Sequence, residues 1–126
     1  MARKLMEALA ADLVVVLPLP EQEYLEDFQS IESIEEYRAL KRLAQEVIPP
    51  GSKVARPLAY RAANETLAAH VDLLVAIWDG EPARGPGGTA EIVELFRQAG
   101  RPLFWIHADQ GPTAGTLTGE RLERLV

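Results

Sequence analysis

Three short apolar runs, each bounded by polar or turn-forming residues, predict the strands of a sheet. The runs cover residues 13–17, 72–78 and 102–106. Their apolar side chains are largely consecutive rather than alternating, which is typical of parallel strands buried on both faces. We therefore expect these segments to be inner strands of a mostly parallel sheet.

Between the runs, apolar side chains recur at helical spacing. Residues 31–48 carry them three or four positions apart, and Ser33 with Glu36 predicts a capping box near the start of a helix. Pro49 ends this pattern. The last residues before it, 46–48, also fit a short strand, so both interpretations stay open there.

Two more helices are expected farther along the chain. Residues 59–70 are rich in alanine and contain neither glycine nor proline, which favours a helix. Thr89, Ile92 and Phe96 follow helical spacing as well. Gly100 comes where a left-handed helix cap belongs.

Strands and helices thus alternate, which is the pattern of an α/β protein. We expect a Rossmann-like three-layer sandwich with a mostly parallel sheet of about four strands, formed by residues 1–126 as a single domain. Residues 108–126 are expected to form a loosely packed tail with a short helix over 120–125, because Gly, Pro and Thr dominate its first part.

Composition narrows the class of protein. The chain has 126 residues, of which 48% are hydrophobic and 25% charged, the balance of a globular domain. No apolar run reaches the roughly 18 residues of a membrane helix, so no membrane partner is expected. The absence of cysteine fits a cytoplasmic location. The net charge of -6 argues against nucleic acid as a partner.

The segment after the second run holds the strongest candidate site. Ligands of parallel sheets bind outside the carboxyl ends of the strands. The glycines that follow this strand lack Cβ atoms, so the backbone can turn sharply and present N–H groups to an anion where a helix begins. Arg84 supplies positive charge and Thr89 a hydroxyl. The candidate ligand-binding residues are Asp79, Gly80, Arg84, Gly85, Gly87, Gly88, Thr89 and Glu91.

A structural interpretation of the same segment has about equal weight. The glycines then make a tight connection from strand to helix, Asp79 caps it, and Glu91 is a first-turn acid that offsets the helix dipole. Tyr60 and Asn64, four positions apart in the alanine-rich helix, are further candidates to reach this cleft.

A second group of candidates follows the first run, namely Pro18, Glu23, Tyr24 and Asp27. Glu23 and Asp27 are four positions apart and would share a helix face, where they can converge on a ligand hydroxyl, bind a divalent ion or remain solvated. Tyr24 can stack on a base, and packing with Phe28 is the alternative. No His or Cys spacing predicts a metal site, and no cofactor is expected.

Two stretches resemble the SLOG-type Rossmannoid domains, a group related to the Lonely Guy phosphoribohydrolases and to DNA-processing protein A. The first, DLLVAIWDGEPARGPGGTAEIVELFRQAGRPLFWIH over 72–107, carries their glycine-rich PGGT loop before a helix. The second, LVVVLPLPEQEYLEDF over 13–28, resembles their LP segment followed by EYxxDF. The resemblance implies binding of a nucleotide or nucleotide derivative, with the glycine loop at the phosphate or ribose.

The chain departs from this family at two places. Lonely Guy enzymes and nucleoside deoxyribosyltransferases have a GTxxE motif whose glutamate acts at the ribosyl carbon. Here Ile92 holds that position and Glu91 lies one residue earlier. The family's amino-terminal strand and first glycine turn have no counterpart, so we expect the first ligand loop to be missing.

The sequence thus predicts a sensor-like nucleotide-binding protein rather than an enzyme. The alternative is a hydrolase or transferase of N-glycosidic bonds, in which Glu91 or Asp79 stabilises the ribosyl cation. A second alternative is an oligomerising relic that binds no ligand. A homodimer is expected, because Leu5, Met6 and Leu9 with an open sheet edge would offer a pairing surface.

Overall fold

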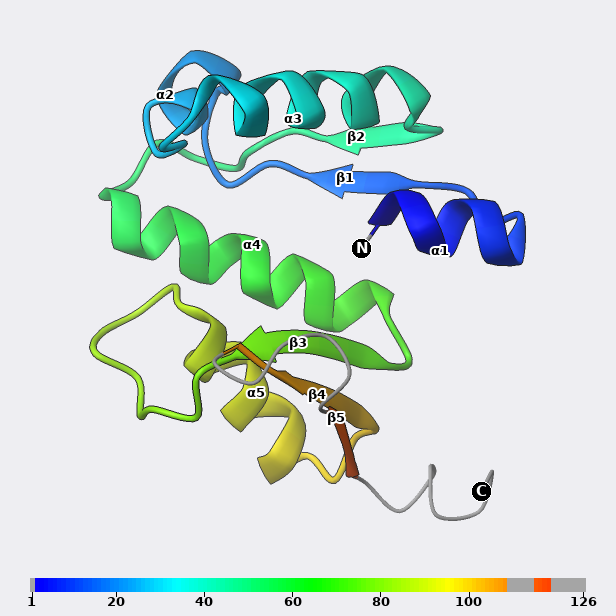
Figure 1. The fold of residues 1–126 in the computed structure, drawn as a ribbon. Coiled ribbons are helices and arrows are strands. Elements are labelled where there is room, and N and C mark those ends of the chain that lie inside the picture. Colours follow the sequence, from blue (N-terminus) through cyan, green and yellow to red (C-terminus); the bar gives the residue numbers. More distant parts are fainter. Residues whose placement is uncertain (1, 109–114, 119–126) are drawn as a thin grey trace. The chain divides into compact units, whose positions relative to one another are not determined.

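The structure is a computed structural model, and it describes residues 2–108 and 115–118 (Figure 1). The protein is mixed α/β, as the alternating pattern predicts. It forms two compact units, Met1–Lys53 and Val54–Val126, and each is described by itself.

The first unit contains a parallel pair of strands. Its elements are α1 (Ala2–Leu9), β1 (Val14–Val16), α2 (Glu21–Leu25), α3 (Ile31–Leu43) and β2 (Glu46–Ile48). Val14 of β1 pairs with Glu46 and Val16 with Ile48. Helix α3 lies along one face of this pair (Figure 1). The short-strand interpretation of residues 46–48 is therefore confirmed.

Helix α3 begins earlier than a capping box at Ser33 would require. Its N-cap is Ser30, which has extended backbone angles and whose hydroxyl accepts a hydrogen bond from the Ser33 N–H at 3.1 Å. The predicted capping box is wrong because Ser33 is the donor in this cap rather than the capping residue.

The second unit contains a three-stranded sheet. Its elements are α4 (Arg56–His70), β3 (Leu74–Trp78), α5 (Thr89–Gln98), β4 (Leu103–His107) and β5 (Gly115–Thr118). Strands β3 and β4 are parallel, and β5 pairs with β4 in the antiparallel sense. The described strands thus form two sheets, one in each unit.

The core of the second unit lies between α5 and its sheet. Val93 and Phe96 of α5 and Leu103 of β4 are at most 1% exposed. Ala76 and Trp78 of β3 pack in the same cluster. Gly100 has a φ of 63° just after α5, which confirms the predicted left-handed cap. This packing fixes β3 against α5.

Arg101 joins the end of α4 to the start of β4. Its guanidinium donates hydrogen bonds to the carbonyl oxygens of Ala68, at 2.7 Å, and Val71, and it lies 4.3 Å from the centroid of the Phe96 ring. The last carbonyls of a helix have no partner within the helix. Arg101 therefore satisfies the end of α4 and holds it beside the core.

Two sequence expectations need correction. Burial of the strands on both faces is wrong, since Ile77 is 54% exposed while its neighbour Ala76 is 3% exposed. Successive strand residues point to opposite faces, and α5 packs on the face that carries Ala76. Residues 115–118 form β5 within the segment that we expected to be a loose tail. The predicted helix over 120–125 lies outside the described residues.

Candidate functional site

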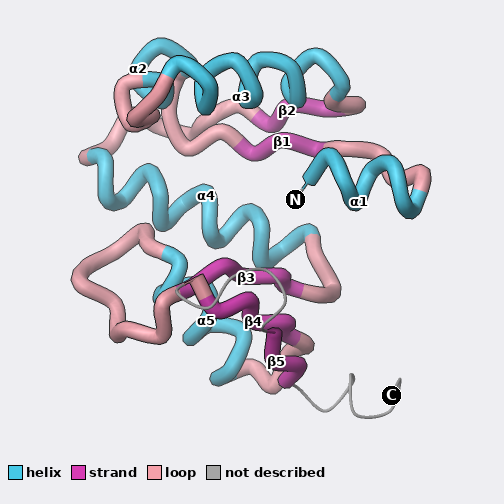
Figure 2. The backbone as a smooth tube through the Cα atoms, in the orientation of Figure 1, coloured by secondary structure: helices cyan, strands magenta, loops and turns pink. Residues whose placement is uncertain are grey.

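The long loop between β3 and α5 can be followed in Figure 2. It borders a cavity of about 380 Å³ in the second unit. The residues lining it are Ile77, Trp78, Asp79, Glu81, Pro82, Ala83, Arg84, Gly85, Gly88, Thr89, Ala90 and Ala108. Five of the predicted ligand-binding residues, Asp79, Arg84, Gly85, Gly88 and Thr89, are thus brought together. Gly80, Gly87 and Glu91 do not line this cavity.

Asp79 organises the turn that leaves β3. One of its carboxylate oxygens accepts a hydrogen bond from the Glu81 N–H at 2.9 Å. Gly80 between them has a φ of 86°, and a Cβ atom there would lie 3.2 Å from the Trp105 ring. This is the structural role that one interpretation gave to Asp79, and the same side chain also borders the cavity.

Gly87 packs the loop against α4 and does not line the cavity. It has a φ of 92°, a region that favours glycine. A Cβ atom there would come within 2.5 Å of the Pro57 carbonyl oxygen and 2.6 Å of the Tyr60 Cβ. The loop therefore approaches the start of α4 as closely as a backbone can.

Gly88 faces the cavity and is the N-cap of α5. No atom lies within 4 Å of the position that a Cβ would take there. Asn64 of α4 donates a hydrogen bond from its side-chain amide to the Gly88 carbonyl at 3.1 Å. A helix N-terminus presents N–H groups and a positive dipole end. The start of α5 is thus held at the cavity by a side chain from α4.

Glu91 is engaged with α4. Its Oε2 accepts hydrogen bonds from the Arg61 guanidinium at 3.1 Å, and its side chain is 17% exposed. Its other oxygen is buried and has no hydrogen-bond partner among the described residues. The sequence marked Asn64 and Glu91 as candidates, but it gave no signal for Arg61, because nothing local couples positions 30 residues apart.

The predicted residues of the first unit lie around α2. Glu23 and Tyr24 belong to this helix, whereas Asp27 follows its end at Leu25. Pro18 is buried. The Tyr24 ring meets those of Phe28 and Tyr37 edge to face, with centroids 5.0 and 5.5 Å apart. The packing alternative for Tyr24 is therefore present in the structure, and burial raises its pKa.

Glu21 connects α2 to α3 through two polar contacts. Its carboxylate accepts hydrogen bonds from Lys41, at 2.8 Å, and from the Tyr37 hydroxyl, at 3.2 Å. The hydrogen bond from Lys41 lowers the pKa of Glu21. Burial and the negative charge of Glu21 raise the pKa of Tyr37 to about 12.

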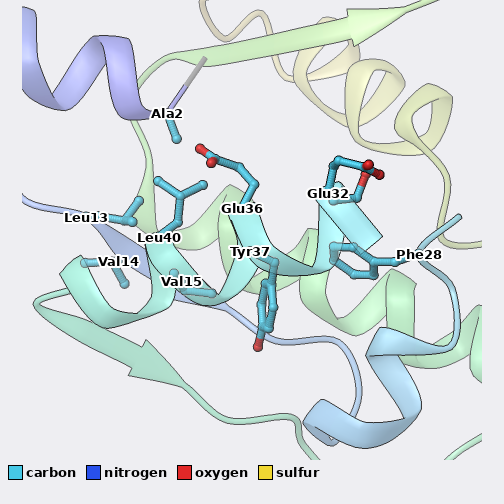
Figure 3. A pocket seen from close by; sticks show the side chains of 10 residues that line it. Ala2, Leu13, Val14, Val15, Phe28, Glu32, Glu36, Tyr37 and Leu40 are labelled. Atoms are coloured by element: carbon cyan, nitrogen blue, oxygen red, sulfur yellow. The ribbon is translucent and has the colours of Figure 1, made fainter. Parts of the chain in front are cut away.

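The first unit has a larger cavity, of about 630 Å³, between α1, β1 and α3 (Figure 3). Leu40 lies beside Leu13 in this view, and the carboxyl groups of Glu32 and Glu36 point away from the Tyr37 hydroxyl. Glu36 accepts two hydrogen bonds of 3.1 Å from Arg3. The lining residues are Ala2, Leu13, Val14, Val15, Phe28, Glu32, Ser33, Glu36, Tyr37 and Leu40. None of the predicted site residues is among them.

Comparisons with known proteins add no assignment: no family model, no curated protein and no solved structure matches the chain. Among the described residues, no helix has the length and apolar character needed to cross a membrane. Leu5 and Leu9 of α1 are 44% and 70% exposed. The homodimer expected from these side chains stays a prediction.

Proposed function

We propose that the chain is a SLOG-type nucleotide-binding protein of the sensor kind, with its ligand in the cavity between β3 and α5. The observation that carries this proposal is that one cavity is bordered by Arg84, Thr89 and the glycine N-cap of α5. These groups offer a charge, a hydroxyl and main-chain amides, which together suit a phosphate or a sugar oxygen. The volume of about 380 Å³ lies within the range of small-ligand pockets.

The same proposal includes the finer fold. The parallel pairs β1–β2 and β3–β4 are the building blocks that a Rossmann-like three-layer sandwich requires. As part of the assignment to this family, we propose that these strands belong to a single sheet of about four strands.

An enzyme that cleaves or transfers a glycosidic bond is the second candidate function. The observation that favours it is that the Asp79 carboxylate borders the cavity. A glycosidic-bond enzyme needs a carboxylate at the sugar to stabilise the developing positive charge. Glu91 is less suited to that task, because Arg61 binds it outside the cavity lining. We favour binding without turnover for this reason.

Binding is tested by calorimetric titration of the full chain with nucleoside monophosphates and with ribose 5-phosphate. Thermal shift gives an independent measure, because ligand at a hundredfold excess over its dissociation constant stabilises by about 2.7 kcal/mol. Gly88→Val should abolish binding while the chain stays folded, since a side chain at Gly88 projects into open space. Absence of binding by all these compounds at millimolar concentration overturns the proposal.

Sensor and enzyme are then separated by incubating the protein with a bound nucleotide and assaying free base by chromatography. The sensor assignment requires that no base appears above the rate without protein. Release that is lost in Asp79→Asn would support the enzyme instead.

A further inference from the structure

Trp78 is the aromatic residue among those that line the cavity of the second unit. It is the last residue of β3, and its side chain is only partly buried. Its indole N–H donates a hydrogen bond to the Glu81 carbonyl oxygen at 3.0 Å. This bond ties the ring to the loop that borders the cavity, so that its orientation is set before any ligand binds.

Trp105 packs beside this ring. The two indole centroids lie 4.9 Å apart, and the Trp105 N–H donates a hydrogen bond of 2.8 Å to the Trp78 carbonyl oxygen. The Arg97 guanidinium lies 5.2 Å from the centroid of the Trp78 ring. Trp105 is not among the residues that line the cavity. The two tryptophans pack together, but of the two only Trp78 is positioned to contact a ligand in the cavity.

The rest of the lining is divided in its chemistry. Arg84 and Thr89 with the start of α5 provide groups that can bind an anion. Asp79 and Glu81 also line the cavity, and Ile77, Pro82 and Ala90 provide carbon surface. A ligand that satisfies both parts carries an anionic group and a flat apolar ring. A nucleotide has both features in one small molecule.

We infer that Trp78 is the platform on which the base of the nucleotide stacks, an inference that rests on the proposed function. Stacking on an aromatic side chain uses the π-face that every base has, so it strengthens binding with little choice among bases. By substitution, one such contact is worth a factor of about 5 to 150 in affinity. The base contact is then carried by Trp78 and the phosphate contact by the glycine loop.

The test compares adenosine monophosphate with ribose 5-phosphate, which lacks the base. In the unaltered chain the first should bind about 5 to 150 times more tightly. Trp78→Leu should bring the ratio of the two dissociation constants close to one and leave ribose 5-phosphate binding unchanged. Trp105→Phe is the matched control and should keep the ratio, since Trp105 does not line the cavity.

Fluorescence gives a second measurement that does not depend on the folding of Trp78→Leu. The chain has two tryptophans, so Trp105→Phe leaves Trp78 as the only indole. Its emission should be quenched by adenosine monophosphate and not by ribose 5-phosphate. In Trp78→Phe, where Trp105 remains, quenching should be absent.

The outcomes separate this inference from the proposed function. If neither compound binds the unaltered chain, both fall. If ribose 5-phosphate binds and the base adds no affinity, or if Trp78→Leu keeps the ratio, only the stacking role of Trp78 is overturned. Unquenched emission of Trp78 in the Trp105→Phe variant with adenosine monophosphate bound overturns it as well.

Discussion

The two cavities described above, one in each unit, are framed by different means. The cavity of the second unit is set by backbone packing, in which Gly87 lies against Pro57 and Tyr60 of α4 and Asn64 holds the Gly88 carbonyl. The cavity of the first unit is set largely by side chains, and the ion pair between Arg3 and Glu36 that reaches it from α1 is half exposed.

The chemistry of the lining, rather than the volume, is the reason we propose the ligand site in the smaller cavity. The larger cavity has mostly apolar walls, and its two carboxylates lie on α3. The smaller one is lined by the N-cap of α5, by Arg84 and Thr89, and by two acidic residues, Asp79 and Glu81. Fixed polar groups that converge on one point are what ligand recognition requires.

Substitution of Gly87 is the strongest test of whether backbone packing frames the cavity of the second unit. Gly87→Ala should lower the free energy of unfolding by about 3 kcal/mol, because a side chain is strained at this φ and meets the backbone of α4. Urea unfolding followed by circular dichroism measures this loss.

Gly88→Ala is the matched control, since a Cβ there meets nothing within 4 Å and the φ of -90° suits any residue. We expect its stability to stay within about 0.5 kcal/mol of the original. Equal effects of the two substitutions would show that the loop is not packed on α4 as described.

A smaller effect is expected in the first unit from Tyr37→Phe. Loss of the hydrogen bond to Glu21 should cost about 1 kcal/mol at neutral pH. Because the folded-state pKa is raised from 10 to about 12, this stability is present below pH 10 and disappears as the pH rises toward 12. An absorbance titration of tyrosinate should therefore lose its highest-pH step in the variant. A titration curve identical to that of the original chain would contradict the assignment.

The smallest effect is expected from Lys41→Met. Removal of the ammonium should raise the pKa of Glu21 back toward its usual 4.5. The lowered pKa contributes stability above pH 4.5 that is lost as the pH falls through the folded-state value. For a pair exposed to this degree the loss should be a few tenths of a kcal/mol at most. Carbon NMR of the Glu21 carboxyl measures the pKa directly, and Lys53→Met should leave it unchanged.

The sequence predicts the positions of helices and strands better than it predicts which other elements they contact. The apolar runs locate β1, β3 and β4, and the spacing of Ile92 and Phe96 identifies the buried face of α5, because strand and helix periods are local properties. Strand β5 is missed, since a segment rich in Gly and Thr has no apolar run and becomes a strand through its pairing with β4.

The candidate site shows the same division. The glycine-rich segment is found from composition, and five of its predicted residues do border one cavity. Two neighbouring glycines nevertheless have opposite roles, because Gly87 packs on α4 whereas Gly88 faces the cavity. Only the position of α4 decides between them, and no local pattern encodes a contact with Pro57. Trp78 both packs against the core cluster and lines the cavity, which an apolar run alone does not reveal.

The ion pair between Arg61 and Glu91 has a consequence for charge at the start of α5. A carboxylate in the first turn opposes any anion that approaches the helix N-terminus. Arg61 neutralises that carboxylate from the side of α4, so the field of the helix end is not cancelled by its own acid. Arg61 does not line the cavity, yet it changes the charge beside it, which matters for an anionic ligand in a chain with a net charge of -6.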